Sequence, residues 1–187
     1  SLGNNQLTTV PKELGSLTAL TELRLDNNQL TTVPKELGLL HALTELQLQA
    51  NQLASVPKEL GSLRALERLY LDENRLTQLP EEVGSLQALE RLDLDGNGLS
   101  SLPKSLVELR SLEQLFLHDN PDLGLPLEVL GARWQECPPE EPANAAEILA
   151  YYFARREGKD RPLNEAKILV VGEPGVGKTE LIHWLVH

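Results

Sequence analysis

Leu20-Thr-Glu-Leu-Arg-Leu-Asp-Asn-Asn28-Gln-Leu30-Thr-Thr-Val33-Pro34 is the stretch that decides the fold of this 187-residue chain, because its leucines, asparagine and proline recur. The leucine that starts it returns every 23 residues, at Leu20, Leu43, Leu66, Leu89 and Leu112. A fixed period of this length is typical of proteins built from stacked repeats. The sequence therefore predicts a solenoid.

The unit L-x-x-L-x-L-x-x-N-x-L-x-x-[VL]-P is identified as the leucine-rich repeat. Its L-x-L segment predicts a short strand with leucines inside and the alternate residues outside. The segment after the proline predicts a short helical or 3₁₀ turn on the convex side. We expect an α/β fold: over residues 1–131, a curved solenoid with parallel strands on its concave face. One asparagine per repeat is expected to bond neighbouring backbone where the chain leaves the strand: Asn28, Asn51, Asn74, Asn97 and Asn120.

Both ends of the repeat region have their own signals. The chain starts inside a strand and contains no methionine, so we expect a fragment that is truncated at both ends. Leu2, Leu7 and Val10 should then leave an uncapped apolar edge. Residues 120–130 depart from the period and, with Trp134, are expected to close the core at the other end.

Function in such an array is expected on the outward strand positions. Tyr70 and Phe116 are predicted to face solvent there as aromatic anchors for a partner. The alternative is a solvated face that tolerates two aromatics. His118 has no Cys or His nearby at ligand spacing, and we expect it at the surface. The candidate partner-binding residues are Arg24, Gln47, Arg68, Tyr70, Arg91, Asp93, Phe116 and His118.

Composition narrows the classes of partner. The net charge is −11, and residues 1–131 carry 19 acidic against 10 basic side chains, which argues against nucleic acid. A basic protein surface is favoured as partner, with simple solubility as the alternative explanation. The single cysteine, Cys137, excludes an internal disulfide framework and fits a reducing, cytoplasmic compartment. No apolar run is long enough to span a bilayer, so we expect no membrane partner.

Residues 132–163 predict a proline-rich connector and a linker helix. Cys137-Pro138-Pro139-Glu140-Glu141-Pro142 should be stiff and extended. Asn144 followed by Glu147 predicts a helix start, and Gly158 a helix end. The apolar stripe of this helix is expected to dock on another part of the protein, with a solvated spacer as the alternative; it comprises Ala145, Ile148, Leu149, Tyr152 and Phe153.

Residues 164–187 predict the first strand, phosphate-binding loop and first helix of a P-loop NTPase. The loop Gly172-Glu173-Pro174-Gly175-Val176-Gly177-Lys178-Thr179 matches G-x-x-x-x-G-K-[ST], between an apolar strand-like run and an apolar helical pattern. Its backbone N–H groups would surround phosphate oxygens, Lys178 would pair with the β- and γ-phosphates, and Thr179 would ligate Mg²⁺. The alternative is a chance glycine turn before a helix.

We predict no catalytic residue and no turnover in these 187 residues. Phosphoryl transfer also needs a second Mg²⁺ ligand, a water-positioning group and a base-reading loop, all of which would come from later strands.

Repeats, a linker helix and a segment that leads into this loop resemble, in that order, the Roco family of multidomain GTPases, its bacterial members especially. The resemblance implies GTP or GDP and Mg²⁺ as ligands of the intact parent, bound by Gly172, Gly175, Gly177, Lys178 and Thr179. It also implies a Ras-like (Roc) domain followed by a dimerising COR domain, and hence a homodimer. The implied partners are a protein on the concave face and, through the linker helix, the G domain of the same chain.

Two other interpretations fit the same residues. The chain is then either a stand-alone leucine-rich repeat binding module with an incomplete, inactive loop, or part of a repeat-bearing signalling ATPase. Such ATPases usually place their repeats after the NTPase, whereas here the repeats come first.

Overall fold

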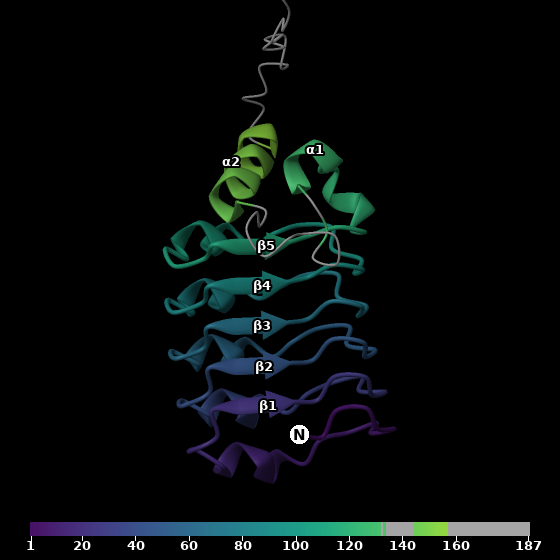
Figure 1. Cartoon of the computed structure of the whole chain (residues 1–187), viewed down its shortest axis with the longest axis vertical. Coiled ribbons are helices and arrows are strands. Elements are labelled where there is room, and N and C mark those ends of the chain that lie inside the picture. Colours follow the sequence, from purple (N-terminus) through teal and green to yellow (C-terminus); the bar gives the residue numbers. More distant parts are fainter. Residues whose placement is uncertain (132, 134–143, 157–187) are drawn as a thin grey trace, which may run out of the picture.

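The computed structural model describes residues 1–131, 133 and 144–156 (Figure 1). The predictions for Trp134, the proline-rich segment, Gly158 and the loop Gly172–Thr179 fall outside these residues and remain predictions.

Five short strands form one parallel sheet in chain order, stacked one above another (Figure 1). Each strand is offset from the next by one repeat, so that the central leucines Leu23, Leu46 and Leu69 lie side by side. The predicted strand-forming L-x-L pattern is confirmed. The strands are β1 (Glu22–Arg24), β2 (Glu45–Gln47), β3 (Arg68–Tyr70), β4 (Arg91–Asp93) and β5 (Gln114–Phe116).

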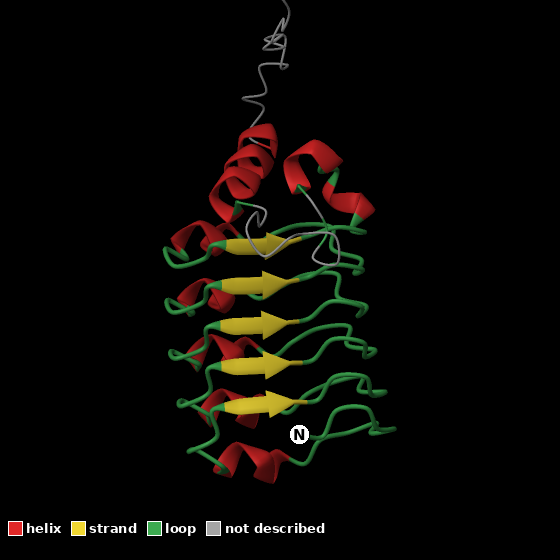
Figure 2. Cartoon of the chain, viewed as in Figure 1, coloured by secondary structure: helices red, strands yellow, loops and turns green. Residues whose placement is uncertain are grey.

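A 3₁₀ helix lies opposite the sheet in each repeat, on the convex side (Figure 2). Each one follows a proline, whose ring fixes φ near the value that the turn requires. The carbonyl of that proline then accepts the first bond of the helix, as in Leu14 N–H to Pro11 O at 3.1 Å. The helices are η1 (Lys12–Ser16), η2 (Lys35–Leu39), η3 (Lys58–Ser62), η4 (Glu81–Ser85) and η5 (Lys104–Glu108).

The core lies between the sheet and these helices and consists almost entirely of leucine. Each middle repeat buries leucines from its strand, its turn and its 3₁₀ helix, as Leu69, Leu76 and Leu60 do. Burial of each leucine contributes roughly 1.5–3 kcal/mol to stability. The chain therefore has one continuous core that runs the length of the stack.

The repeat asparagines bond backbone as predicted. Asn74 Oδ1 accepts from Leu53 N–H at 3.0 Å, and its Nδ2 donates to Leu48 O at 3.0 Å and Leu71 O at 3.1 Å. Two of these three partners belong to the preceding repeat. Asn51, Asn97 and Asn120 repeat the same pattern.

The apolar edge expected at the first repeat is only partly present. Leu2 is 39% exposed and Leu7 is half-buried, but Val10 is buried, so the expectation was wrong for Val10. The underlying reason is that residues 2–5 already pair with the next coil, beginning with Leu2 N–H to Arg24 O at 2.8 Å, which brings Val10 over the core.

The other end of the stack is covered by helices. After β5 come η6 (Pro121–Leu123), α1 (Leu127–Leu130) and α2 (Ala145–Arg156). α2 packs on η5, β5 and α1. The predicted helix start is confirmed, since Asn144 Oδ1 accepts from Ala146 N–H at 3.0 Å. Among the residues described, no helix is long and apolar enough to cross a membrane.

The apolar stripe of α2 packs against the repeats. Ala145, Ile148, Leu149 and Tyr152 are buried there, so the prediction that this helix docks is confirmed. The expected contact with a G domain must use another face of α2, because this stripe is already occupied, and it remains a prediction.

A glycine in each of the 3₁₀ helices η1–η4 lets the next repeat pack closely. A Cβ at Gly15, Gly38, Gly61 or Gly84 would lie 2.3–2.4 Å from the nearest atom of the following repeat. The fifth repeat has Val107 at this position, and its side chain is 61% exposed. A sixth coil in the same register would clash with Val107, and α2 packs on this end instead.

We predict that Gly61→Ala lowers the free energy of unfolding by about 1–3 kcal/mol, because the new methyl group would press on the Glu82 carbonyl. Val107→Ala should change it by less than about 0.5 kcal/mol, since that side chain is exposed. Urea unfolding measures both. Equal effects of the two substitutions would contradict this account of how the repeats pack.

The concave face as a candidate partner-binding surface

The outward side chains of β1–β5, which we call the concave face, are open at the end near β1. The side chains of Arg24 and Arg68 are exposed, and Gln47 and Tyr70 are half-buried. Arg68 Nε lies 2.7 Å from Glu45 Oε2. Burial opposes the ionisation of Glu45, but hydrogen bonds from Gln47 and Arg68 outweigh it and lower the pKa of the carboxyl. This half presents a polar surface that partners can reach.

Arg91 holds two aromatic rings in place at the centre of the face. Its guanidinium carbon lies 4.8 Å from the ring centroid of Tyr70 and 4.9 Å from that of Phe116. Its Nη2 also lies 3.0 Å from Asp93 Oδ2. Such cation–π contacts are strongest when they are shielded from water, and Arg91 is buried. Tyr70 is thus fixed on one side and accessible on the other.

The end near β5 is closed, contrary to expectation. Phe116 is 1% exposed and His118 is 2% exposed, so the predictions that both face solvent were wrong. Arg91 covers the ring of Phe116, as described above. His118 is enclosed where the chain leaves α1, with Nε2 3.1 Å from Gly131 O and Nδ1 3.6 Å from Asp95 Oδ1.

The eight predicted contact residues therefore divide into two groups. Four are accessible: Arg24, Gln47, Arg68 and Tyr70. The other four are buried and could act on a partner only by positioning accessible neighbours: Arg91, Asp93, Phe116 and His118. Their role in binding remains a prediction.

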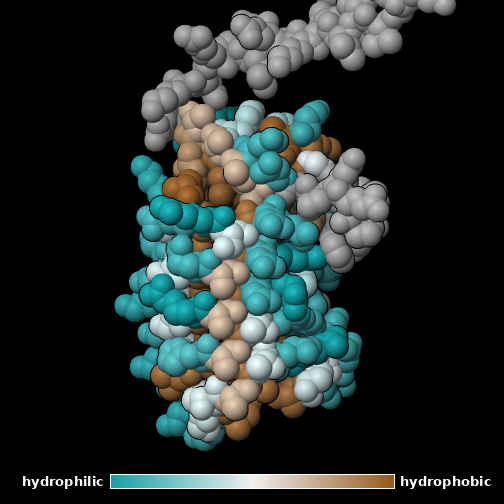
Figure 3. Space-filling view, turned by 60° about the vertical axis from the view of Figure 1, so that its left-hand side comes forward, coloured by the Kyte–Doolittle hydropathy of each residue, from teal (hydrophilic) through white to brown (hydrophobic). Residues whose placement is uncertain are grey.

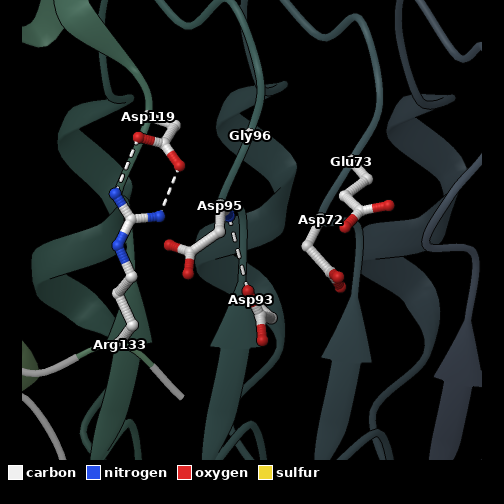
Figure 4. A pocket seen from close by; sticks show the side chains of 7 residues that line it. All are labelled: Asp72, Glu73, Asp93, Asp95, Gly96, Asp119 and Arg133. Carbon is white, nitrogen blue, oxygen red and sulfur yellow. Dashed lines mark hydrogen bonds and ion pairs between the residues drawn. The ribbon is translucent and has the colours of Figure 1, made fainter. Parts of the chain in front are cut away.

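A small acidic hollow of about 100 Å³ lies just beyond the carboxyl ends of β3 and β4 (Figure 4). Asp72, Asp93 and Asp95 line its centre. Asp119 lies at one side and forms a bidentate ion pair with Arg133. Arg133 Nη1 is 2.5 Å from Asp119 Oδ2, and Arg133 Nη2 is 2.9 Å from Asp119 Oδ1. The repeated Asp72 and Asp95 are a sequence signal for this hollow, because they occupy equivalent positions in neighbouring repeats. Arg133 lies outside the repeats and had no such signal.

Two family models match the solenoid. The model described as leucine rich repeat matches residues 1–53, and the model described as leucine-rich repeat region matches residues 58–131. Residues 1–131 are a leucine-rich repeat region. A search of the curated proteins finds no match.

Solved structures with leucine-rich repeats resemble the chain over the same region. A leucine-rich repeat protein of Leptospira interrogans is 45% identical, with a TM-score of 0.62, and the match covers 63% of this chain and 30% of that protein. A TDR receptor is 32% identical over 60% of this chain and 20% of its own length, with a TM-score of 0.56. An internalin of Listeria monocytogenes is 28% identical, with a TM-score of 0.54, and the match covers 62% of this chain and 33% of the internalin. The chain thus spans less than a third of the Leptospira protein.

Three carboxylates of this leucine-rich repeat face, those of Asp72, Asp93 and Asp95 in the hollow, resist ionisation. Burial, with the nearby Asp93 charge, raises the pKa of Asp72 to about 7 and that of Asp95 to about 6. Burial also raises the pKa of Asp93, although Arg91 opposes the shift. Within the described ranges, no group of three or more His, Cys, Asp or Glu side chains is arranged to hold a metal ion. Ion pairs of Asp93 with Arg91 and of Asp119 with Arg133 offset part of the negative charge of the hollow.

We predict that Asp72→Asn stabilises the protein at about pH 8, by about 1 kcal/mol after allowance for solvent screening. The pKa of Asp72 is about 7 when folded, against an ordinary 3.8. Between these values the folded protein holds a proton that the unfolded chain has lost, so stability falls as pH rises through this window. Asp72→Asn should flatten that fall in melting experiments.

The exposed Glu90→Gln serves as the control for this prediction, because it removes one negative charge from outside the hollow. An equal gain in stability from both substitutions would attribute the effect to net charge and would contradict the role given to Asp72.

Proposed function

We propose that this leucine-rich repeat module binds a protein partner with a basic surface on its concave face, as the interaction part of a Roco-like GTP-binding signalling protein. The observation that carries the proposal is the acidic hollow next to a fixed, accessible aromatic ring. Repeat arrays of this kind serve as protein-interaction scaffolds. One similar structure is, by its name, a receptor, which supports a binding role for this chain by analogy.

Tyr70 supplies the anchor in this proposal. Burial raises the pKa of its hydroxyl, so the side chain stays neutral, and Arg91 fixes its ring from one side. Aromatic side chains that are held in place lose little conformational freedom on binding and often dominate interface energy.

The hollow supplies charge complementarity. Asp72, Asp93 and Asp95 repel one another, and each has a raised pKa. A lysine or arginine of a partner would relieve this repulsion and favour the ionised carboxylates. The acidic excess of the repeats would also raise the rate of encounter with a basic surface.

We predict that Tyr70→Ala and Asp72→Asn each weaken partner binding by roughly tenfold or more. The measurement is capture from a lysate of the native host, followed by titration of the captured protein against each variant. Glu82→Gln, an exposed change on the convex side, should leave binding unchanged. A partner that binds all four proteins equally, or that binds more tightly as salt rises, would refute the assignment to this face.

We propose as a second function that the loop Gly172–Thr179 binds GTP and Mg²⁺ in the intact parent. The full match to the phosphate-loop pattern supports this, with Lys178 pairing with the phosphates and Thr179 ligating the metal. By the Roco resemblance, the parent would hydrolyse GTP and dimerise.

GTP and ATP binding, measured with Mg²⁺ on a chain that continues past His187, tests this second function. We expect selective GTP binding that Lys178→Ala weakens at least about tenfold. Preference for ATP would place the parent among repeat-bearing ATPases. Absence of binding would leave a stand-alone interaction module with an inactive loop.

A further inference from the structure

A second surface hollow lies at the capped end of the solenoid, between η5 and α2. Its volume is about 350 Å³, at the lower end of the range of ligand-binding pockets. Leu106, Leu112 and Leu149 form a buried apolar floor, and the exposed Val107 and Ala150 form the rim. Figure 3 shows apolar surface gathered at this end of the molecule.

The hollow is part of the fold, because hydrogen bonds hold α2 in place beside it. The carboxyl-terminal half of α2 is fastened to the last repeat: Tyr152 Oη accepts from Leu102 N–H at 3.0 Å, and Arg156 donates to Ser100 O at 3.3 Å. Arg155 also donates to Gly124 O. The other half of the helix faces η5 with short alanine side chains, which leave the space unfilled.

The single charged side chain among those of the described residues that line the hollow is Arg110. It is exposed, and no hydrogen bond or ion pair joins it to another described residue. An exposed arginine beside an apolar groove favours an occupant that brings a carboxylate to pair with it.

We infer that this groove binds an amphipathic helix of a partner protein that inserts an apolar side chain beside a carboxylate. Grooves between helices commonly bind such segments, whose apolar side chains are spaced one helical turn apart. The apolar side chain would contact Leu106, Leu112 and Val107, and the carboxylate would pair with Arg110. This site is separate from the concave face and is independent of the function proposed for it.

Fluorescence anisotropy with two synthetic helical peptides tests the inference on the full chain. One peptide has leucines at positions i, i+3, i+4 and i+7 flanked by glutamates, and its twin has lysines in place of the glutamates. We expect the glutamate peptide to bind at least about tenfold more tightly than its twin. Arg110→Ala should remove that preference, and Val107→Glu should weaken binding of the glutamate peptide by at least about tenfold.

Leu39→Glu is the matched control for Val107→Glu. It places the same charge at another exposed apolar position on the convex side, where Leu39 is 52% exposed, and it should leave peptide binding unchanged. Circular dichroism and melting of each variant confirm folding, which is expected because Val107 and Arg110 are both exposed.

Three outcomes would overturn the inference. The first is equal binding of the two peptides, and the second is absence of binding by either. The third is self-association of the chain in sedimentation velocity that Val107→Glu abolishes, because the groove would then be filled by a second copy. The inference would be supported if Val107→Glu abolished binding of the glutamate peptide while Leu39→Glu and Tyr70→Ala left that binding unchanged.

Discussion

The asparagine ladder is the interaction on which the rest of the structure depends. Each strand has only three residues, so many backbone N–H and C=O groups of a coil lie outside the sheet and need another hydrogen-bond partner. Buried backbone groups that lack a partner cost about 1–3 kcal/mol each. Asn74 satisfies three of them at once, and two of these belong to the preceding repeat. The ladder therefore satisfies the interior of each coil and joins it to its neighbour at a fixed spacing.

This fixed spacing is what gives the molecule a functional face. Because every coil is held in the same register, Tyr70, Asp93 and Phe116 lie side by side although 23 residues separate each from the next. The same regularity brings Asp72 close to Asp93 and Asp95. Burial raises the pKa of Asp72 and of Asp95, and repulsion from the Asp93 charge, which the fixed spacing holds close to them, raises both further. A flexible chain would have relieved that repulsion by moving the carboxylates away from one another.

Local pattern predicted the regular parts of the fold and failed where the regularity ends. The strands, the 3₁₀ helices, the ladder and the Asn144 cap each depend on a few adjacent residues or on the repeat itself. The burial of His118 depends on Gly131, which lies outside the period. The docking site of α2 likewise depends on contacts across 50 residues, such as that of Tyr152 with Leu102. Val107 did carry a local signal, since it alone replaces the packing glycine of the 3₁₀ helices.

The hydrogen bonds and packing that hold α2 on the repeats restrict how a change at the proposed nucleotide site, Gly172–Thr179, could alter the angle of the solenoid. Tyr152, Arg155 and Arg156 bond backbone groups of Leu102, Gly124 and Ser100, and the apolar stripe of the helix is buried on the same repeat. A helix held along its length by packing and at one end by hydrogen bonds moves with the body it is bound to. A change in the angle of the solenoid must therefore either break these bonds or be made after Arg156. Breaking them would expose Tyr152 and Ile148 to water, so both the hydrogen bonds and the packing oppose the first of these routes.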